Sequence, residues 1–389
     1  MTISGVAHIA GAYEHPGRHL PDRTLPQIHR DVAQGALADA GLSFSDVDAY
    51  YSGGDAPGFG VLSMADYLGL ECTTVDDTET GGSSYLVHVQ HAAAAIAAGQ
   101  VNVALITLAG KPRTGGAAPG GSGKVSNAPE SAFETQWGIN VPGAYALAAQ
   151  RHMYEFGTTS RQLAEIKVAA SQHAQHNPHA WLPNAVTIDE VLESPVVADP
   201  LHRLDCCVIT DGGGALVVVS EAVAKSLPRH TIPVLGTGTG VKHTNAGRID
   251  LTHTGAVLSG PRAFAEAGLA PSDINYASIY DSFTITVLIT LEDLGFCEKG
   301  KGGEFVSDGG LLARGGRLPF NTDGGGLCNN HPANRGGMTK VIEAVRQLRS
   351  EAHPEVQVPD CELALAHGTG GSLATRSASA TLILGRDAR

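Results

Sequence analysis

The sequence of 389 residues is poor in aromatic and charged side chains and has no excess of positive charge. Aromatic residues make up 5% and charged residues 17% of the chain, and the formal net charge is −13. A net charge of this sign opposes binding to nucleic acid or to an anionic membrane surface, so neither partner is expected. No apolar run reaches the length of a membrane span. A phosphate-bearing ligand would therefore have to be bound by a local group of cations.

Cysteine is also scarce, and the cysteines that are present show no metal-binding pattern. The six cysteines have no CxxC spacing and no secretory leader precedes them, so we expect free thiols in a reducing cytoplasm. His88 with His91, and His173 with His176, lack a third ligand at a suitable spacing, and no metal site is expected. Residues 115–123 are rich in glycine but lack the Gly-Lys-Ser/Thr ending of a phosphate-binding loop, which argues against nucleotide hydrolysis.

Glycine, in contrast, is abundant, and its 49 residues cluster in short turns, as is typical of an α/β protein with many tight connections. A twelve-residue pattern occurs twice, at 36–47 and 263–274, and each copy reads as a helix end, a glycine stop, a Ser-Asp turn and a strand. One match of this length can arise by chance, but the pattern favours a duplicated α/β unit. We expect an N-terminal half at 1–228, with a loop-rich insertion at about 111–200, and a C-terminal half at 229–389.

Hydrophobic patterning predicts the other elements of the two halves. In the first half, a helix at 82–98 is expected between buried strands at 72–76 and 101–108. A stretch rich in glycine and proline then runs from residue 111 to about residue 142. The remaining expected elements are helices at 145–156, 160–176 and 338–349, and strands at 215–220, 276–279, 362–366 and 378–384.

Three short motifs carry polar side chains that are suited to catalysis. The first is a glycine-rich turn at 321–332, which ends in a His-Pro pair at His331 just before the last expected helix. Glycines let the backbone approach a ligand closely, and an imidazole can donate a hydrogen bond or act as a base near neutral pH. The second motif is Tyr280 with Asp281, directly after an expected strand. The third is His367 on a Gly-Thr-Gly-Gly turn.

Together these motifs resemble those of the thiolase superfamily, whose members make or break carbon–carbon bonds next to a coenzyme A thioester. His331 matches the His-Pro residue of the family, and His367 matches the acid–base position of the sterol-carrier-protein type. Tyr280 matches the Tyr-Asp-x-Phe turn of the lipid-transfer-protein-type aldolases. The resemblance covers nearly the whole chain. It implies an α/β protein with the thiolase fold, five-layered α/β/α/β/α with two duplicated halves, and a homodimer packed through the sheet edges of the first halves.

The resemblance fails at one position that matters for the chemistry. Thiolases carry a nucleophilic cysteine at the start of the central helix of the first half, where the helix dipole and free amides lower the thiol pKa. Here the end of that helix, 95–99, matches the family pattern, and counting back places Gly82 where the cysteine belongs, while the nearest cysteine is Cys72. Three interpretations of the adjoining Ser83 and Ser84 are open: a helix cap, glycines that make room for substrate beside helix amides that bind the thioester oxygen, and a serine nucleophile.

The resemblance also implies roles for the other site residues. His331 is expected to bind the thioester oxygen, while His367 or Tyr280 removes the proton of a β-hydroxyl group. Cys328 is a candidate for a substitute nucleophile. Thiolases have glycine before the His-Pro pair, whereas this chain has Asn330. The residues expected to bind the substrate or an oxyanion are Gly82, Ser83, Ser84, Asp281, Cys328, Asn330 and Gly370.

We therefore predict a cytoplasmic enzyme that acts on a carbon–carbon bond of an acyl-CoA thioester by retro-aldol cleavage of a β-hydroxyacyl-CoA, without a cysteine nucleophile. One alternative is an acyl-CoA acetyltransferase or thiolase with an unconventional nucleophile, Ser83 or Cys328. Another is a non-catalytic subunit in a complex with a small zinc-ribbon/OB-fold protein that binds the CoA end, a partner that relatives in this branch often have. No covalently bound cofactor is expected, because coenzyme A enters as part of the substrate.

Overall fold

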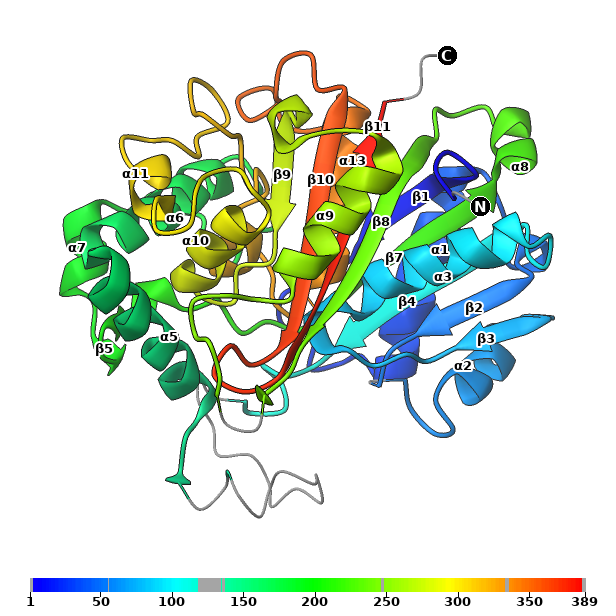
Figure 1. The fold of residues 1–389 in the computed structure, drawn as a ribbon. Coiled ribbons are helices and arrows are strands. Elements are labelled where there is room, and N and C mark those ends of the chain that lie inside the picture. The colour runs from blue at the N-terminus through cyan, green and yellow to red at the C-terminus, as the bar shows by residue number, and fades with distance from the viewer. Residues whose placement is uncertain are drawn as a thin grey trace.

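One long mixed sheet runs through the protein in the computed structural model, which describes residues 3–54, 56–117, 134, 137–245, 248–332 and 336–386. The strand order of the sheet is β3-β2-β4-β7-β1-β8-β11-β10-β9 (Figure 1). Its first end consists of β1 (Ala7–Glu14), β2 (Ala49–Ser52), β3 (Thr74–Asp76), β4 (Val103–Gly110) and β7 (Gly212–Ser220). Its second end consists of β8 (Ile232–Lys242), β9 (Tyr276–Ile279), β10 (Leu363–Gly371) and β11 (Ser377–Gly385).

The two ends of the sheet have the same topology. In the first end, β7 pairs antiparallel with both β1 and β4, and β4 pairs parallel with β2. In the second end, β11 pairs antiparallel with both β8 and β10, and β10 pairs parallel with β9. The ends are joined where β1 pairs with β8, at Ile9 and Ile232. The predicted duplication is confirmed by this pairing pattern, while the boundary between residues 228 and 229 stays a prediction.

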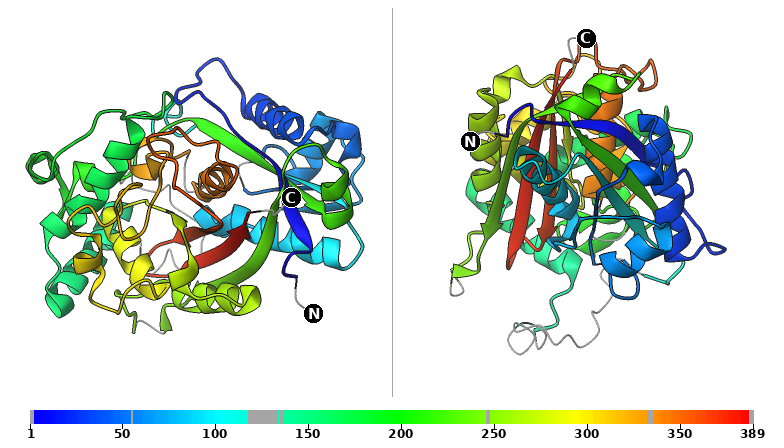
Figure 2. Two further views of the ribbon diagram at one scale, coloured as in Figure 1. Left: turned by 90° about the horizontal axis from the view of Figure 1, so that it is seen from above. Right: turned by 90° about the vertical axis from the view of Figure 1, so that its right-hand side faces the viewer.

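Helices form three layers around and between the two ends of the sheet. The helices α3 (Ser84–Ala97) and α13 (Gly337–Leu348) contact each other and share one hydrophobic core with strands of both ends. The helix α1 (Leu25–Ala40) covers the outer face of the first end, and α9 (Ala256–Ala267) covers that of the second end (Figure 2). The five layers are, in order, α1, the first end of the sheet, α3 with α13, the second end of the sheet, and α9. This order confirms the predicted five-layered fold.

The twelve-residue repeat folds in the same way in both copies. The helix α1 ends at Gly41, with φ of 72°, and α9 ends at Gly268, with φ of 67°, which is the left-handed backbone that glycine adopts without strain. A 3-10 turn follows each glycine, at Phe44–Asp46 and at Pro271–Asp273, and leads into β2 or β9. The repeat therefore marks equivalent positions of the two halves, as predicted.

The remaining elements surround this frame. The helices are α2 (Val61–Leu68), α5 (Val141–Phe156), α6 (Ser160–Ala174), α7 (Ile188–Glu193), α8 (Glu221–Ser226), α10 (Thr284–Asp293), α11 (Gly302–Val306) and α12 (Gly325–Cys328). The strands β5 (Val196–Ala198) and β6 (Leu201–His202) form a separate small sheet. Much of the predicted glycine- and proline-rich stretch, residues 118–133, 135 and 136, lies outside the described residues. Within the described ranges, every helix is too short or too polar to cross a bilayer.

Three predicted elements differ from the structure in ways that affect the site. The strand β3 starts at Thr74, after Cys72, and is only partly buried because it is the edge strand of the sheet. The helix predicted at 82–98 begins as a 3-10 turn at Gly81–Ser83 before α3. The strand β10 continues to Gly371 because it stays paired with β11 along its whole length. His367 therefore lies inside a strand, and the prediction that it sits on a turn is wrong.

Candidate active site

The first residues of α3 and α13 meet at one point between the two ends of the sheet. A Cβ atom added to Gly337 would lie 1.9 Å from the carbonyl oxygen of Gly82, so the backbones of the two helix starts are in direct contact. The first amides of a helix have no partners within it, and together with the helix dipole they create a positive potential. Two such helix starts, side by side, are suited to stabilise an oxygen that gains negative charge.

Tyr280 and His331 meet beside these helix starts. Tyr280 is the first residue after β9, and its hydroxyl oxygen lies 2.8 Å from Nε2 of His331. The two rings are tilted by 60°, with their centroids 5.4 Å apart. The backbone amide of His331 donates a hydrogen bond to Oγ1 of Thr210 at 2.9 Å. The exposed fractions of Tyr280 and His331 are only 3% and 7%, so the pair is largely screened from water.

The His331 imidazole is neutral at physiological pH. The pKa of His331 is lowered to about 4, mainly by burial; Asp281 raises it in part, and Lys340 adds to the lowering. In the tautomer of the neutral imidazole that carries its proton on Nδ1, Nε2 accepts a hydrogen bond from the phenol of Tyr280. A phenol and a neutral imidazole in contact can pass a proton between a substrate and the protein.

The ring of Tyr280 fills the space beside Gly82. A Cβ atom added to Gly82 would lie 2.5 Å from Cε2 and 2.7 Å from Cζ of Tyr280. It would also lie 2.3 Å from the carbonyl oxygen of Thr369. The interpretation that Gly82 makes room for substrate is therefore wrong, because the Tyr280 ring occupies the space that a side chain at residue 82 would fill. The expectation that helix amides bind the thioester oxygen stays a prediction.

The two serines after Gly82 bond to the residue before the turn. The hydroxyl of Ser83 donates to the carbonyl oxygen of Thr80 at 2.8 Å, and Oγ of Ser84 accepts from the amide of Thr80 at 2.8 Å. Neither hydroxyl caps the amides of α3, so the helix-cap interpretation is wrong. Among the described residues, the hydrogen bonds of Ser83 include no histidine or carboxylate, and its role as a nucleophile has no activating base.

The backbone of His367 adjoins Tyr280, whose amide donates to its carbonyl oxygen at 2.9 Å, but the side chain of His367 lies away from those of Tyr280 and His331. Its Nδ1 lies 2.9 Å from Oγ1 of Thr381, which in turn lies 2.9 Å from Oγ of Ser259 in α9. The next residue, Gly368, faces the other way, since a Cβ atom there would lie 2.8 Å from the carbonyl oxygen of Gly82. Side chains alternate between the two faces of a strand, and His367 is on the outer face, away from α3. The prediction that His367 is the acid or base is therefore not supported by its position.

Asp281 lies in a buried ion pair behind the tyrosine. Its Oδ1 is 2.8 Å from Nζ of Lys340, and both side chains are 1% exposed. Its carboxylate also accepts hydrogen bonds from the amides of Gly326 and Leu327 at 2.8 and 3.0 Å. Burial lowers the pKa of Lys340, but Asp281, Asp323 and Glu14 together raise it by more, so the net pKa is above the ordinary value. Asp281 thus ties the Tyr280 turn to α12, and its predicted role in substrate binding stays a prediction.

Two further predicted residues lie in packed surroundings. Cys328 is fully buried, and burial raises the pKa of its thiol although Lys167, whose Nζ lies 3.1 Å from its Sγ, lowers it. A thiol held in its protonated form is a poor nucleophile. A Cβ atom added to Gly370 would lie 1.8 Å from the carbonyl oxygen of Thr80, so Gly370 packs against the turn that precedes α3. Both assignments to the substrate site stay predictions.

A pocket of about 510 Å³ lies beside the site and was not predicted by any motif. The guanidinium of Arg113 stacks on the ring of Trp181, with Cζ 3.7 Å from the ring centroid. The pocket runs along 206–209, a segment whose amides bond to the carbonyl oxygens of Ser282 and Gly326 in the active-site loops. Its lining combines cations with apolar groups: His19, Arg113, Ala117, Trp181, Leu182, Arg203, Leu204, Cys206, Cys207, Val208 and Ile209.

Comparison with known proteins agrees with this geometry. Residues 238–386 match the family described as "Thiolase C-terminal domain-like". An acetyl-CoA acetyltransferase of Methanothermobacter thermautotrophicus is 34% identical over 90% of this chain and 92% of its own length. A steroid side-chain-cleaving aldolase of Thermomonospora curvata is 35% identical over 89% of this chain and 91% of its own length. A solved structure described as "Ltp2-ChsH2(DUF35) aldolase" has 33% identity and a TM-score of 0.89, with 100% of this chain and 99% of that chain covered.

Proposed function

This chain belongs to the thiolase superfamily, in the branch of the sterol-carrier-protein-type thiolases and the thiolase-like aldolases, and we propose that it cleaves a β-hydroxyacyl-CoA by a retro-aldol reaction. Its relatives are named as aldolases, lyases and acetyltransferases, so the chain is an enzyme of this superfamily. The proposal concerns which reaction it catalyses and which residues carry that reaction.

The observation that carries the proposal is the contact between Tyr280 and Gly82. An acyl-transfer cycle needs a nucleophilic side chain at the start of α3. At residue 82 the Tyr280 ring and the backbone of Thr369 leave no room for such a side chain. A hydroxyl group that is bonded to a neutral imidazole stands there instead. This exchange replaces a covalent nucleophile by an acid–base pair, which is what a retro-aldol step requires.

In the proposed reaction, the β-hydroxyl group of the substrate loses its proton to the oxygen of Tyr280, while Tyr280 passes its own proton to Nε2 of His331. The Cα–Cβ bond breaks, the β-carbon becomes a carbonyl group, and the electron pair moves into the thioester to form an enolate. The amides at the starts of α3 and α13 hold the enolate oxygen. The pair then returns the proton to Cα, which releases a shorter acyl-CoA and a ketone or aldehyde.

The helix amides supply the electrostatic part of this scheme. Preorganised donors of this kind typically contribute about 2.7–4 kcal/mol each to transition-state stabilisation. Their effect is increased by the low exposure of Tyr280 and His331, because water does not compete in a dry site. The helix amides thus take the oxyanion role that the sequence assigned to His331 together with the amides of residues 82–84.

The pocket along 206–209 supports a CoA thioester as substrate. The net charge of −13 repels phosphate groups, so binding depends on a local set of cations. Arg113 and Arg203 provide such cations, next to an indole ring and aliphatic side chains that suit the apolar parts of the ligand. We propose that the CoA part lies in this pocket while the acyl part reaches Tyr280.

We propose two kinds of partner. The relative of known structure with a TM-score of 0.89 is a complex of two proteins, which supports a small zinc-ribbon/OB-fold partner for this chain as well. The strand β3 is the edge of the sheet and is partly buried, and it is where we expect the first halves of two copies to pack as a homodimer.

The alternatives predict different products. An acyltransferase needs Ser83 or Cys328 as its nucleophile, and the surroundings of both groups oppose this role. A non-catalytic subunit would show no turnover with or without a partner. The similarity to the acetyltransferase of M. thermautotrophicus keeps acyl transfer as the alternative to be tested.

The purified chain should be incubated with β-hydroxyacyl-CoA thioesters that carry aliphatic, aromatic or steroid side chains, with and without a co-expressed zinc-ribbon/OB-fold protein. Mass spectrometry would detect the shorter acyl-CoA and the carbonyl product. We expect both products in equal amounts, and no mass increase of the intact protein. An acyl adduct on the protein, or no turnover with any of the substrates or partners, would overturn the proposal.

A further inference from the structure

The residue before His331 is where this chain departs from the thiolase pattern, and its side chain has a defined position. Nδ2 of Asn330 donates to Oε1 of Glu14 at 2.9 Å, and Oδ1 of Asn330 accepts from Oγ1 of Thr210 at 2.6 Å. The same Thr210 oxygen accepts the hydrogen bond from the amide of His331. Asn330 is 1% exposed, and the hydrogen bonds of its side chain stay within the protein. Its predicted role in substrate binding therefore lacks support from its contacts.

Glu14 is the centre of this arrangement. It is the last residue of β1, in the first half of the protein, whereas His331 belongs to the second half. Oε1 of Glu14 accepts hydrogen bonds from Nη2 of Arg18 at 2.9 Å and from Nδ2 of Asn329 at 3.3 Å, besides the one from Asn330. Burial raises the pKa of Glu14, but Arg18 and Arg346 lower it to a net value below the ordinary one. With Arg346 bonded to its Oε2 at 3.4 Å, Glu14 is an ionised, almost fully buried acceptor for donors from four residues.

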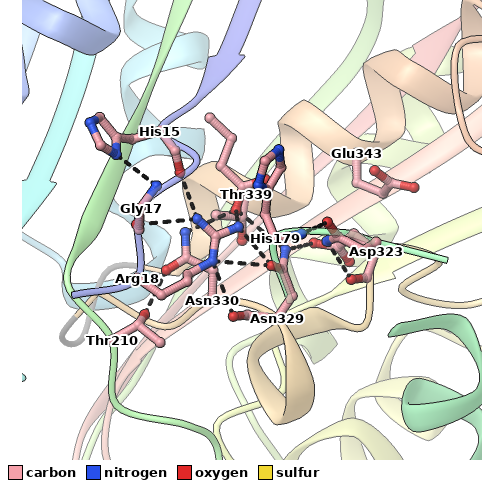
Figure 3. Close-up of polar contacts among 12 residues, drawn as sticks. His15, Gly17, Arg18, His179, Thr210, Asp323, Asn329, Asn330, Thr339 and Glu343 are labelled. Atoms are coloured by element: carbon pink, nitrogen blue, oxygen red, sulfur yellow. Dashed lines mark hydrogen bonds and ion pairs between the residues drawn. The ribbon is translucent and has the colours of Figure 1, made fainter. Parts of the chain in front are cut away.

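Arg18 holds the same segment from its other side. Its Nη2 donates to Oδ1 of Asn329 at 2.7 Å, and its Nε lies 3.2 Å from the backbone oxygen of Asn329. Figure 3 shows Arg18 and Asn329 facing one another, with Thr210 next to Asn330. Arg18 is 7% exposed, so these charge-assisted bonds are shielded from water.

We infer that Glu14 and Arg18, acting through Asn329 and Asn330, are positioning residues for His331. The short helix α12 ends at Cys328, so regular helical bonding does not extend to His331. Glu14 and Arg18, with the Asn329 and Asn330 side chains that they bond, hold this segment instead, and we call these four residues the clamp. The clamp sets where the imidazole of His331 meets the phenol of Tyr280. Neither Glu14 nor Arg18 is proposed to touch the substrate. The inference rests on the proposed catalytic role of His331.

Three substitutions test the clamp in steady-state kinetics: Asn330→Gly, Glu14→Gln and Arg18→Lys. A displacement of about 1 Å in a catalytic group costs on the order of 100-fold in rate, so we expect kcat to fall by about that factor while KM for the acyl-CoA stays nearly constant. The matched control is Arg349→Lys. Arg349 also joins α13 to the first half, by a 2.8 Å ion pair with Asp39 and a bond to the oxygen of Ala10, but it contacts none of the clamp residues. The Arg349→Lys substitution should lower the melting temperature and leave kcat unchanged.

A double-mutant cycle distinguishes positioning from a general loss of structure. If the clamp acts through the contact between His331 and Tyr280, then Asn330→Gly should cost far less kcat in a Tyr280→Phe background than in the wild type. Asn330→Gly lowering kcat by the same factor in both backgrounds would overturn the inference. A kcat within twofold of wild type in the folded clamp variants would do so as well. If Glu14→Gln does not fold, the other two variants carry the same test.

A measurement without substrate keeps this test apart from the proposed reaction. ¹⁵N-histidine spectra of the ligand-free protein report the hydrogen bonding of each imidazole, and His331→Gln identifies the signal of His331. We expect Asn330→Gly and Arg18→Lys to shift this signal, and Arg349→Lys to leave it in place. An unshifted signal in both clamp variants would refute the clamp even if the protein proves to be no aldolase, and a shifted signal would support it in the same case.

Discussion

A side chain at residue 82 and the aromatic ring of Tyr280 would compete for the same volume: a Cβ atom on Gly82 would lie 2.5 Å from Cε2 of the ring. In a close-packed interior such an overlap cannot be relieved by a small shift, since backbone atoms of Thr369 are on the other side at 2.3 Å. A side chain at 82 and a tyrosine at 280 therefore exclude one another. The choice between them is also a choice between covalent and acid–base catalysis.

The first prediction concerns Gly82. Gly82→Ala should lower the free energy of unfolding by about 1–3 kcal/mol, because overpacking against backbone is not relieved by rotamer changes. It should also abolish measurable turnover, since the methyl group displaces the Tyr280 ring. Gly82→Cys should behave in the same way and form no acyl-enzyme with acyl-CoA. Urea unfolding and intact mass measure these outcomes.

The control for Gly82 is Gly143→Ala in α5, where an added Cβ atom would approach only the side chains of Asn140 and Ile139, at 3.0 Å or more. This variant should keep wild-type stability and turnover. An active Gly82→Ala enzyme, or an acylated Gly82→Cys protein, would show that the Tyr280 ring moves aside readily and that the site is not committed to acid–base chemistry.

The second prediction concerns the hydroxyl group of Tyr280. Tyr280→Phe keeps the ring that packs on Gly82 and removes only the group that contacts His331. General acid–base catalysis contributes about 10²–10⁴-fold, and we expect kcat to fall within this range. Stopped assays with LC–MS quantification cover the span. The control is Tyr276→Phe, four residues earlier at the start of β9, whose hydroxyl lies 3.4 Å from the amide of Thr322. Turnover of Tyr280→Phe within threefold of Tyr276→Phe would remove the phenol from the mechanism.

The third prediction separates the two histidines that the motifs suggested. His367→Gln should change kcat by less than about threefold, which is under ~0.7 kcal/mol of transition-state free energy. It should lower the free energy of unfolding by about 1–3 kcal/mol, because the buried Thr381 hydroxyl loses one of its two partners and keeps only Ser259. His331→Gln should abolish turnover. A folded His367→Gln enzyme with kcat reduced by on the order of 100-fold would restore the role expected from the sequence.

The case of His367 shows what the sequence was able to predict. The repeated helix–glycine–turn–strand pattern predicted the duplicated frame, because left-handed glycines and helix ends are local features. Tyr280 and His331 were predicted from motifs that lie next to regular elements. The face on which His367 lies was not predictable, because it depends on how far β10 continues, and that is set by its pairing with β11. A shift of one residue in a strand moves a side chain to the other face.

Contacts between distant segments were also beyond the sequence. The clamp of Glu14 on Asn330 and of Arg18 on Asn329 joins residues more than 300 positions apart, and neither charged residue belongs to a recognisable motif. The only signal was the replacement of glycine by Asn330 before the His-Pro pair. The pocket beside 206–209 draws its two arginines, Arg113 and Arg203, from separate segments, so spacing along the chain gave no indication of it.

The last prediction concerns pH. Burial lowers the pKa of His331, His88 and His173 to about 4 and that of His367 to about 3. In the unfolded chain these groups titrate near 6.5. Between these pKa values only the unfolded chain binds the protons. The contribution of these histidines to the free energy of unfolding is therefore complete above pH 6.5 and falls as the pH drops toward 4. Each imidazole contributes a slope of about 1.4 kcal/mol per pH unit in this window.

Glu343 opposes part of this trend. Burial, followed by the charge of Asp323, raises the pKa of Glu343 to about 7, so as the pH falls the native state binds this proton before the unfolded chain does. Urea unfolding from pH 4.5 to 7.5 measures the net slope, and His173→Gln should reduce it by one proton. If His331 is neutral in the free enzyme, kcat/KM corrected for the folded fraction should stay level between pH 5 and 6.5. An acid limb centred near 6.5 in that profile would mean that the His331 imidazole is solvated, and the dry Tyr280–His331 pair would have to be abandoned.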